Sequence, residues 1–390
     1  MCELEAVWPQ HPGASHSALR VGSATTPRYV RVVGPLGRRA AFFLLGVTIV
    51  SAGGTGVGCA IAAPGWRGPA TEHFDGHRFF GPGADSADGF DSPKWLSALL
   101  TWQAHRQRGP WREYHDEPYG PRPPRDVGPG KLRVTFINHA TTLIQLDGVN
   151  VLTDPIYSRR CSPFDFIGPR RVRPPGIRFE DLPRIDAVIL SHDHYDHLDV
   201  PTLKRLAQAW PAMRVFAGLG TRALLERKGL EVIELDWWEA RQLKGITIRS
   251  VPNQHFSNRG LGDSDNTLWT AWSLEGQGGK AYFGGDTGYG PHFKEAGERV
   301  GPFRLAVLPI GAYRPEWFMG RVHESPAQAV QAALDLRASM AVPMHYGTFQ
   351  LADDGETEPV EALEAALRET PAPFVVLGFG EGRDVPEADP

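Results

Sequence analysis

Apolar residues follow two different periods from residue 131 onward. Three short apolar runs open this part of the chain as predicted strands: 132–137, 142–146 and 149–153. Asp147-Gly148 separates the last two, and this dipeptide is typical of a hairpin turn. Between Leu203 and Trp210, apolar side chains instead recur at i, i+3, i+4 and i+7, which predicts a helix with one face on a sheet.

Alternating strands and helices continue to the end of the chain. Further strands are predicted at 187–190, 214–217, 231–235, 246–251, 268–274, 281–283, 305–308, 341–342 and 374–377. Further helices are predicted at 93–106, at 221–228, from Ser325-Pro326 through Leu334, and at 360–367. The early strands have antiparallel character and the later ones alternate with helices. This order predicts an α/β (α+β) protein with two sheets face to face and helices outside, a four-layer αββα sandwich.

The N-terminal third has a different pattern. Residues 1–37 are polar without a period and are expected to be disordered. In residues 38–66, Arg38-Arg39 precede a long uncharged run with an apolar centre and a small-residue tail, which predicts an export signal or an uncleaved membrane anchor. The catalytic domain is therefore expected outside the cytoplasm.

Residues 67–130 form the next segment, and residues 131–390 are expected to be the catalytic domain. The stretch 74–119 is rich in aromatic residues that need burial and lack periodic partners of their own, so we expect it to wrap over the core. The proline-rich stretch 121–129 is expected to be an extended linker.

The composition removes several classes of protein. The net charge is −4, with 41 Lys+Arg against 45 Asp+Glu, so no global basic field indicates a nucleic-acid partner. Three cysteines provide neither a disulfide framework nor a Cys-x-x-Cys zinc site. Any bound metal is therefore expected to have histidine and aspartate ligands.

Three histidines and two aspartates fall within six residues directly after the apolar run 187–190. The sequence is His192-Asp193-His194-Tyr195-Asp196-His197. Histidine is the commonest metal ligand among side chains, and carboxylates suit hard or borderline cations. A loop that leaves a buried strand can hold such ligands rigidly, so this pattern predicts a metal site rather than a polar loop that happens to be rich in histidine.

Three further candidate ligands each follow a different predicted strand: His255, Asp286 and His345. Strand ends on one edge of a sheet converge in space, so these side chains are expected to meet the histidine cluster. The seven expected ligands are His192, His194, Asp196, His197, His255, Asp286 and His345. One catalytic zinc needs only three protein ligands, so seven are enough for two metals with one shared carboxylate.

The cluster at 192–197, with Asp286 and His345 at these distances, resembles the metallo-β-lactamase superfamily. Other motifs resemble its N-acyl-phosphatidylethanolamine-hydrolysing phospholipase D branch: Asn138-His139-Ala140-Thr141, Leu152-Thr153-Asp154-Pro155, the segment 252–259, Gly285-Asp286-Thr287-Gly288-Tyr289, Ile310-Gly311-Ala312-Tyr313 and the segment 344–349. The resemblance extends over residues 74–380.

The resemblance implies two zinc ions per subunit. It assigns the first to His192, His194 and His255, and the second to Asp196, His197 and His345, with Asp286 bridging both. His323 matches a family histidine near the substrate. Asp193 is expected to orient the imidazole of one metal ligand without binding the metal itself. The residues expected to act in the reaction are thus Asp286, His323 and Asp193.

The reaction that this resemblance implies is hydrolysis of an N-acyl-ethanolamine phospholipid to an N-acylethanolamine and phosphatidic acid. The same ligands would also serve a lactonase of the superfamily, because an activated water can attack a carbonyl as well as a phosphorus. A third alternative is a binding protein of this fold that has lost its metal ions. This alternative predicts that some of the metal-binding residues are missing from the sequence. The sequence is also compatible with a homodimer, since dimers occur in the family that it resembles.

A phospholipid substrate requires contact with a membrane surface. The aromatic stretch 74–119 and the loop 313–319, with Trp317, Phe318 and Met319, provide the apolar side chains for it. Tyrosine and tryptophan favour membrane interfaces because their rings are apolar and their polar atoms stay hydrated. Burial in the core is the alternative for each aromatic residue.

Overall fold

Two β-sheets form the centre of the protein in the computed structural model, which describes residues 62–82, 93–260 and 262–387. The first sheet contains β1 (Leu132–Asn138), β2 (Thr141–Leu146), β3 (Val149–Thr153), β4 (Ala187–Ile189), β5 (Arg214–Gly218), β6 (Val232–Leu235) and β13 (Gly382–Asp384), in the order β13-β1-β2-β3-β4-β5-β6. The second contains β7 (Ala240–Leu243), β8 (Ile246–Val251), β9 (Ala271–Gly276), β10 (Gly279–Phe283), β11 (Leu305–Pro309) and β12 (Ala341–Met344), in the order β12-β11-β10-β9-β8-β7.

The main core lies between these sheets. Phe136 and Ile144 of the first sheet belong to the same buried cluster as Trp272 and Phe283 of the second. Every one of these side chains is fully shielded from solvent. The apolar alternation along each strand therefore places one row of side chains against the opposite sheet.

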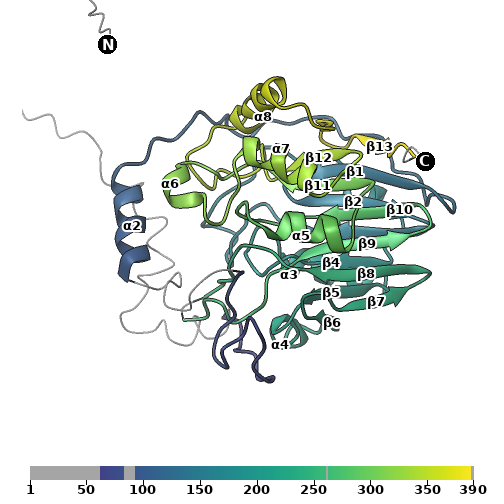
Figure 1. The fold of residues 1–390 in the computed structure, drawn as a ribbon, viewed down its shortest axis with the longest axis horizontal. Coiled ribbons are helices and arrows are strands. Elements are labelled where there is room, and N and C mark those ends of the chain that lie inside the picture. Colours follow the sequence, from purple (N-terminus) through teal and green to yellow (C-terminus); the bar gives the residue numbers. More distant parts are fainter. Residues whose placement is uncertain (1–61, 83–92, 261, 388–390) are drawn as a thin grey trace, which may run out of the picture. The chain divides into compact units, whose positions relative to one another are not determined.

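Helices cover the outer faces. The helices are α2 (Pro93–Ala104), α3 (Val200–Ala209), α4 (Thr221–Glu226), α5 (His292–Arg299), α6 (Glu316–Met319), α7 (Pro326–Asp335) and α8 (Glu358–Glu369). Leu203 of α3 and Leu224 of α4 pack on the outer side of the first sheet. Phe293 of α5 and Ala333 of α7 pack on the second, in front of its strands in Figure 1. The predicted four-layer αββα sandwich is confirmed.

Each sheet changes from antiparallel to parallel pairing. Strands β1, β2 and β3 are antiparallel neighbours, and β3 to β6 are parallel. Strands β7 to β10 are antiparallel neighbours, and β10 to β12 are parallel. It follows that β1, β3 and β4 share one direction in the first sheet, while β8, β10 and β12 share one in the second. Their carboxyl ends lie at a common edge of each sheet.

Most predicted elements occur within a few residues of their expected bounds. The hairpin is confirmed, because Leu146 pairs with Val149 and both turn residues have positive φ, 52° at Asp147 and 83° at Gly148. The strand predicted at 374–377 is wrong: Phe374 makes one isolated bridge to Ala341, and the final strand is β13. The stretch 313–319, expected as a loop, contains the short helix α6.

The expected export signal or anchor lies almost entirely outside the described residues and stays a prediction, as does the expected disorder of 1–37. No helix in the described part of the chain is long and apolar enough to cross a membrane. The aromatic stretch is partly buried as expected. Phe74, Phe79 and Trp102 are within the protein, whereas Tyr114 and Tyr119 are exposed.

One buried carboxylate ties the N-terminal segment to the catalytic part of the chain. Oε1 of Glu356 accepts hydrogen bonds of 2.6 Å from both Arg112 and Arg173. Burial alone would raise the pKa of Glu356, but these two guanidinium groups outweigh it and hold the pKa at about 2, below the usual 4.5. Because the folded pKa is depressed, this stabilisation is present above pH 4.5 and is lost as the pH falls toward 2.

Replacing Glu356 by Gln should therefore reduce the free energy of unfolding at pH 7 by about 2 kcal/mol, with screening by solvent included. The difference from wild type should disappear as the pH falls from 4.5 toward 2. Urea unfolding at several pH values measures it. Glu387→Gln is the control, because Glu387 pairs with Lys131 in solvent and should change stability little. An equal loss of stability at pH 3 and pH 7 would show that the ion pairs of Glu356 with Arg112 and Arg173 do not cause the difference.

Candidate metal centre

Six strand ends bring polar side chains to one place. In the first sheet, His139 follows β1, Asp154 follows β3, and the segment 192–197 follows β4. In the second sheet, His255, Asp286 and His345 follow β8, β10 and β12. The shared direction of these strands puts all of these residues at the same end of the sandwich. The convergence expected from the sequence therefore occurs in the structure.

A glycine allows the two sheets to approach at this end. Gly285 has φ of 62°, in the left-handed region that favours glycine. A Cβ atom at this position would lie 2.4 Å from the Cβ atom of Ser191, which is closer than side chains allow. The Gly284-Gly285 pair thus lets Asp286 enter the centre beside the loop that follows β4.

Three histidines form the first group of inward-facing ring nitrogens. Nε2 of His192 lies 2.8 Å from Nδ1 of His194, and Nε2 of His255 lies 3.3 Å from the same atom. Nitrogen ligands of a tetrahedral zinc ion are about 3.3 Å apart at the usual bond length. The three nitrogens therefore have spacings close to those of ligands around one metal ion.

Hydrogen bonds on the outer side of two rings leave their inner nitrogens without protons. His255 donates from Nδ1 to the carbonyl oxygen of Val322 at 2.9 Å. The hydroxyl of Ser191 gives its proton to Asp154, so it accepts from Nδ1 of His192 at 2.9 Å. Both rings direct an Nε2 lone pair at the centre, as metal-binding histidines do.

Asp196, His197, His345 and Asp286 form the second group. Nε2 of His197 lies 3.2 Å from Oδ2 of Asp196 and 3.1 Å from Oδ2 of Asp286. Nε2 of His345 lies 3.4 Å and 3.0 Å from the same two atoms. Oδ2 of Asp286 is also 3.9 Å from Nε2 of His255, so this carboxylate lies between the two groups.

The protonation of the centre differs between its histidines. Burial would lower the pKa of His197 and His345, but Asp286 and Asp196 outweigh it and raise the pKa of His197 well above its usual value and that of His345 to about 9, so each of these two rings would release a proton on binding a metal ion. Burial lowers the pKa of His192 well below its usual value and that of His194 to about 4, so both imidazoles are neutral near pH 7. Burial would raise the pKa of Asp196 and Asp286, but the neighbouring histidines, His197 foremost, outweigh it and hold both carboxylates ionised.

Atoms without partners give the same indication. Oδ1 of Asp286 is buried and makes no hydrogen bond, and Nε2 of His197 makes none of acceptable geometry although two carboxylate oxygens lie within 3.2 Å of it. Burying a polar atom without a partner costs roughly 1–3 kcal/mol, and a charged one more. Imidazole and carboxylate donors suit divalent first-row metal ions, which would satisfy these atoms. The residues present thus fit the metal ions that the sequence leads us to expect.

His323 and Asp193 differ in their relation to this centre. Nδ1 of His323 lies 3.9 Å from Oδ2 of Asp286, and its side chain remains 13% exposed, so it stands at the rim. The carboxylate of Asp193 accepts from the backbone N–H of Asn258 at 3.0 Å, and none of its hydrogen bonds in the described structure reaches an imidazole. The expectation that Asp193 orients a ligand ring is therefore not met.

Asp154 has the contacts that were expected of Asp193. It accepts from Nδ1 of His197 at 2.7 Å and from the hydroxyl and backbone N–H of Ser191. His139 is a second residue that the sequence reasoning did not place in the centre, and its Nε2 lies 2.9 Å from Oδ2 of Asp196. Both residues could have been found from their positions in the sequence, because each is a polar residue that directly follows a buried strand.

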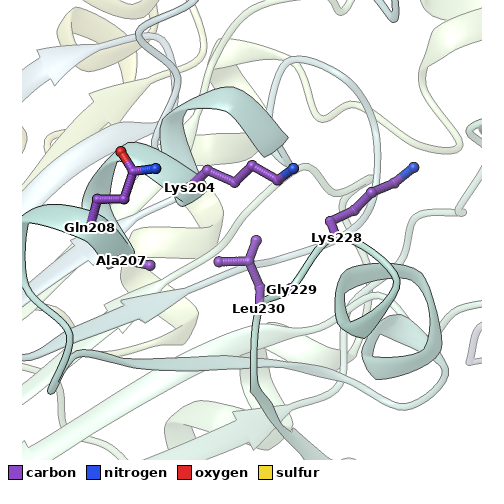
Figure 2. Close-up of a pocket in the computed structure, with 6 residues that line it drawn as sticks. All are labelled: Lys204, Ala207, Gln208, Lys228, Gly229 and Leu230. Atoms are coloured by element: carbon purple, nitrogen blue, oxygen red, sulfur yellow. The ribbon is translucent and has the colours of Figure 1, made fainter.

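A separate hollow lies between α3 and the turn after α4 (Figure 2). Lys204, Ala207, Gln208, Lys228, Gly229 and Leu230 line it. None of them belongs to the histidine cluster. This hollow takes no part in the centre described above.

Comparison with known sequences finds a matching family model and several relatives of this chain. A family model described as a beta-lactamase superfamily domain matches residues 149–346. An uncharacterised protein of Mycobacterium tuberculosis is 45% identical over 242 residues, which are 60% of this chain and 64% of that protein. The N-acyl-phosphatidylethanolamine-hydrolyzing phospholipase D 1 of Caenorhabditis elegans is 41% identical over 238 residues, 58% of this chain and 66% of that protein. The chain thus spans less than two thirds of the length of these relatives.

Comparison with solved structures supports the fold. The crystal structure of a possible metal-dependent hydrolase from Veillonella parvula aligns with a TM-score of 0.52 at 17% sequence identity. The match covers 65% of this chain and 99% of that one. At this identity the likeness concerns the fold alone.

Proposed function

Because this chain belongs to the metallo-β-lactamase superfamily and is a metal-dependent hydrolase of that fold, we propose that it hydrolyses a phospholipid phosphodiester with two zinc ions. The substrate of this proposal is an N-acyl-phosphatidylethanolamine. Water attacks phosphorus, the bond from phosphorus to the ethanolamine oxygen breaks, and the products are an N-acylethanolamine and phosphatidic acid.

The observation that carries the proposal is the complete set of inward-facing donors. His192, His194 and His255 would hold one ion, and Asp196, His197 and His345 the other, a group that also includes His139 as a candidate ligand. Asp286 would contact both, because its Oδ2 faces both groups. The identity to the nematode phospholipase D supports the phosphodiester substrate.

The chain's own residues would position the reactants. Two bound ions would supply an activated water and positive charge next to the reacting phosphorus. Burial lowers the pKa of His323 to about 4, so its imidazole is neutral near pH 7 and can donate one N–H to a phosphoryl or leaving oxygen. Its Nδ1 is buried 3.9 Å from Oδ2 of Asp286 without a hydrogen-bond partner, while the side chain is 13% exposed, so the ring lies between the centre and the solvent from which a substrate would approach.

The test combines metal analysis with two classes of substrate. Purified protein should contain two zinc ions per chain and release N-acylethanolamine and phosphatidic acid from N-acyl-phosphatidylethanolamine. Small lactones, assayed beside it, test the lactonase alternative. Turnover of lactones without turnover of the phospholipid would overturn the proposed substrate.

Exposed apolar side chains on α2 and α6 support contact with a lipid surface. Trp317 of α6 is 61% exposed, and Leu96 and Leu100 of the adjacent helix α2 are about half exposed. Phe318 instead packs on Trp102 at a ring distance of 5.1 Å. Figure 1 shows α2 and α6 side by side. The chain continues from α6 to Val322 and His323, the residues at the rim of the centre.

Replacing Trp317 by Ala should reduce activity on vesicle-embedded substrate roughly tenfold, because the exposed indole would lose its burial in lipid. Activity on a short-chain, water-soluble phosphodiester should change little. The ratio of the two activities cancels any general loss of folded enzyme. Leu334→Ala, an exposed leucine on α7, is the control and should leave the ratio unchanged. An unchanged ratio for Trp317→Ala would mean that the indole does not contact the lipid surface.

A further inference from the structure

His139 is held firmly at the tip of the β1–β2 hairpin. It is 1% exposed and has φ of 47°, in the left-handed region. Its backbone N–H donates to the hydroxyl of Thr348 at 3.1 Å, and its carbonyl oxygen accepts from the backbone N–H of His345 at 2.9 Å. The hairpin tip is thus bonded to the loop that carries His345.

The side chain of His139 reaches one carboxylate of the centre. Its Nε2 lies 2.9 Å from Oδ2 of Asp196. An ionised carboxylate can only accept, so His139 carries its proton on Nε2 and donates. Nδ1 then holds a lone pair and is buried without a partner. The opposite tautomer would leave a buried N–H without an acceptor and is less favourable.

The position of His139 distinguishes it from the expected ligands. His197 and His345 both lie within 3.4 Å of Asp196 and within 3.1 Å of Asp286. His139 contacts Asp196 and has no contact with Asp286 among the described ion pairs. Its ring nitrogen belongs to the same cluster of candidate ligand atoms as those of Asp196, His197 and His345, but it meets this cluster through Asp196 and not through Asp286.

We propose that His139 is a positioning residue that donates from Nε2 to Asp196 and fixes the carboxylate that holds the second metal ion. This inference rests on the proposed two-metal function. Asp196 is in a loop without regular structure, and its Oδ2 faces Nε2 of both His197 and His345. The bond from His139 selects one orientation of the carboxylate before metal arrives. Residues that orient ligands in this way typically contribute about 10–100-fold to metal affinity.

Two substitutions distinguish the effect of the hydrogen bond from the effect of the backbone conformation at residue 139. In His139→Gln the side-chain amide nitrogen reaches about as far as Nε2 and can still donate. In His139→Asn the amide is too short, although asparagine tolerates a left-handed backbone better than glutamine. The Asn variant should lose about 10–100-fold in affinity for the second zinc ion, and the Gln variant should stay near wild type. A backbone effect would give the reverse order.

The measurement is a zinc titration of the full-length protein against a chromogenic chelator, which resolves two affinities without an activity assay. The affinity of the ion held by His192, His194 and His255 should be unchanged in both variants. Phe349→Leu is the control for packing, since Phe349 contacts the His139 ring at 5.3 Å, and it should retain both affinities. Equal second-site affinity in wild type and His139→Asn would overturn the inference, as would a Gln variant as weak as the Asn variant. A wild-type protein that binds fewer than two ions would instead overturn the proposed function.

Discussion

Replacing Asp286 by Asn should weaken binding of both metal ions and lower kcat/KM about a thousandfold or more, equivalent to roughly 4 kcal/mol of lost transition-state stabilisation. The reason is its position. Oδ2 of Asp286 lies within 3.1 Å of Nε2 of both His197 and His345, and 3.9 Å from that of His255. The substitution removes a negative charge that would offset two dications, while the side chain keeps its size.

Two histidine variants provide the comparison for Asp286. His255→Ala should lose affinity mainly for the ion shared with His192 and His194, and His345→Ala mainly for the ion beside Asp196 and His197. Metal content after dialysis against a weak chelator distinguishes a loss of one ion from a loss of two. An Asp286→Asn protein that keeps two tightly held ions and normal turnover would show that this carboxylate does not bridge them.

The strands of the core could be predicted because burial on both faces leaves a clear apolar run. β3 and β8 have the predicted bounds, and the four layers follow from the order of elements. β7 was not predicted, because its sequence Ala-Arg-Gln-Leu is an exposed edge strand with no apolar face. Helix α5 was not predicted for a similar reason. Its sequence is mostly polar apart from buried residues such as Phe293 and Ala296, so it shows no clear apolar period.

The convergence of the seven side chains could be predicted because histidine and aspartate residues that follow buried strands gather at one edge of a sheet. The residues that orient them could not be assigned in this way. An aspartate adjacent to a ligand in sequence, such as Asp193, is a plausible partner, yet its carboxylate bonds to Asn258. Asp154 is far from His197 in sequence and meets it only because β3 and β4 are parallel neighbours. Long-range pairing decides which carboxylate reaches which ring.

Asp154 connects both halves of the centre through one buried carboxylate. Oδ2 accepts from Nδ1 of His197 at 2.7 Å and from the hydroxyl of Ser191, while Oδ1 accepts from the backbone N–H of Ser191 at 2.7 Å. Ser191 in turn accepts from His192. Asp154 therefore fixes the proton of His197 on Nδ1 directly and that of His192 through the serine hydroxyl. In both rings this leaves Nε2 free to bind a metal ion.

Replacing Asp154 by Asn should abolish tight binding of the second metal ion and reduce turnover by about 10⁴-fold, the loss seen when an analogous substitution favours the wrong histidine tautomer. The amide can still accept from the backbone N–H of Ser191, but its NH₂ group then faces the donor atom Nδ1 of His197. The imidazole avoids this clash by moving its proton to Nε2, which removes the lone pair that points to the metal.

Zinc titration should therefore show a lost second site, and the chemical shifts of ¹⁵N-labelled histidine should show the altered tautomer of His197. Asp193→Asn is the matched control, because that buried carboxylate makes no hydrogen bond to an imidazole in the described structure and its replacement should leave both metal affinities near wild type. If Asp154→Asn bound two zinc ions as tightly as wild type with His197 still protonated on Nδ1, control of the tautomer by Asp154 would be excluded.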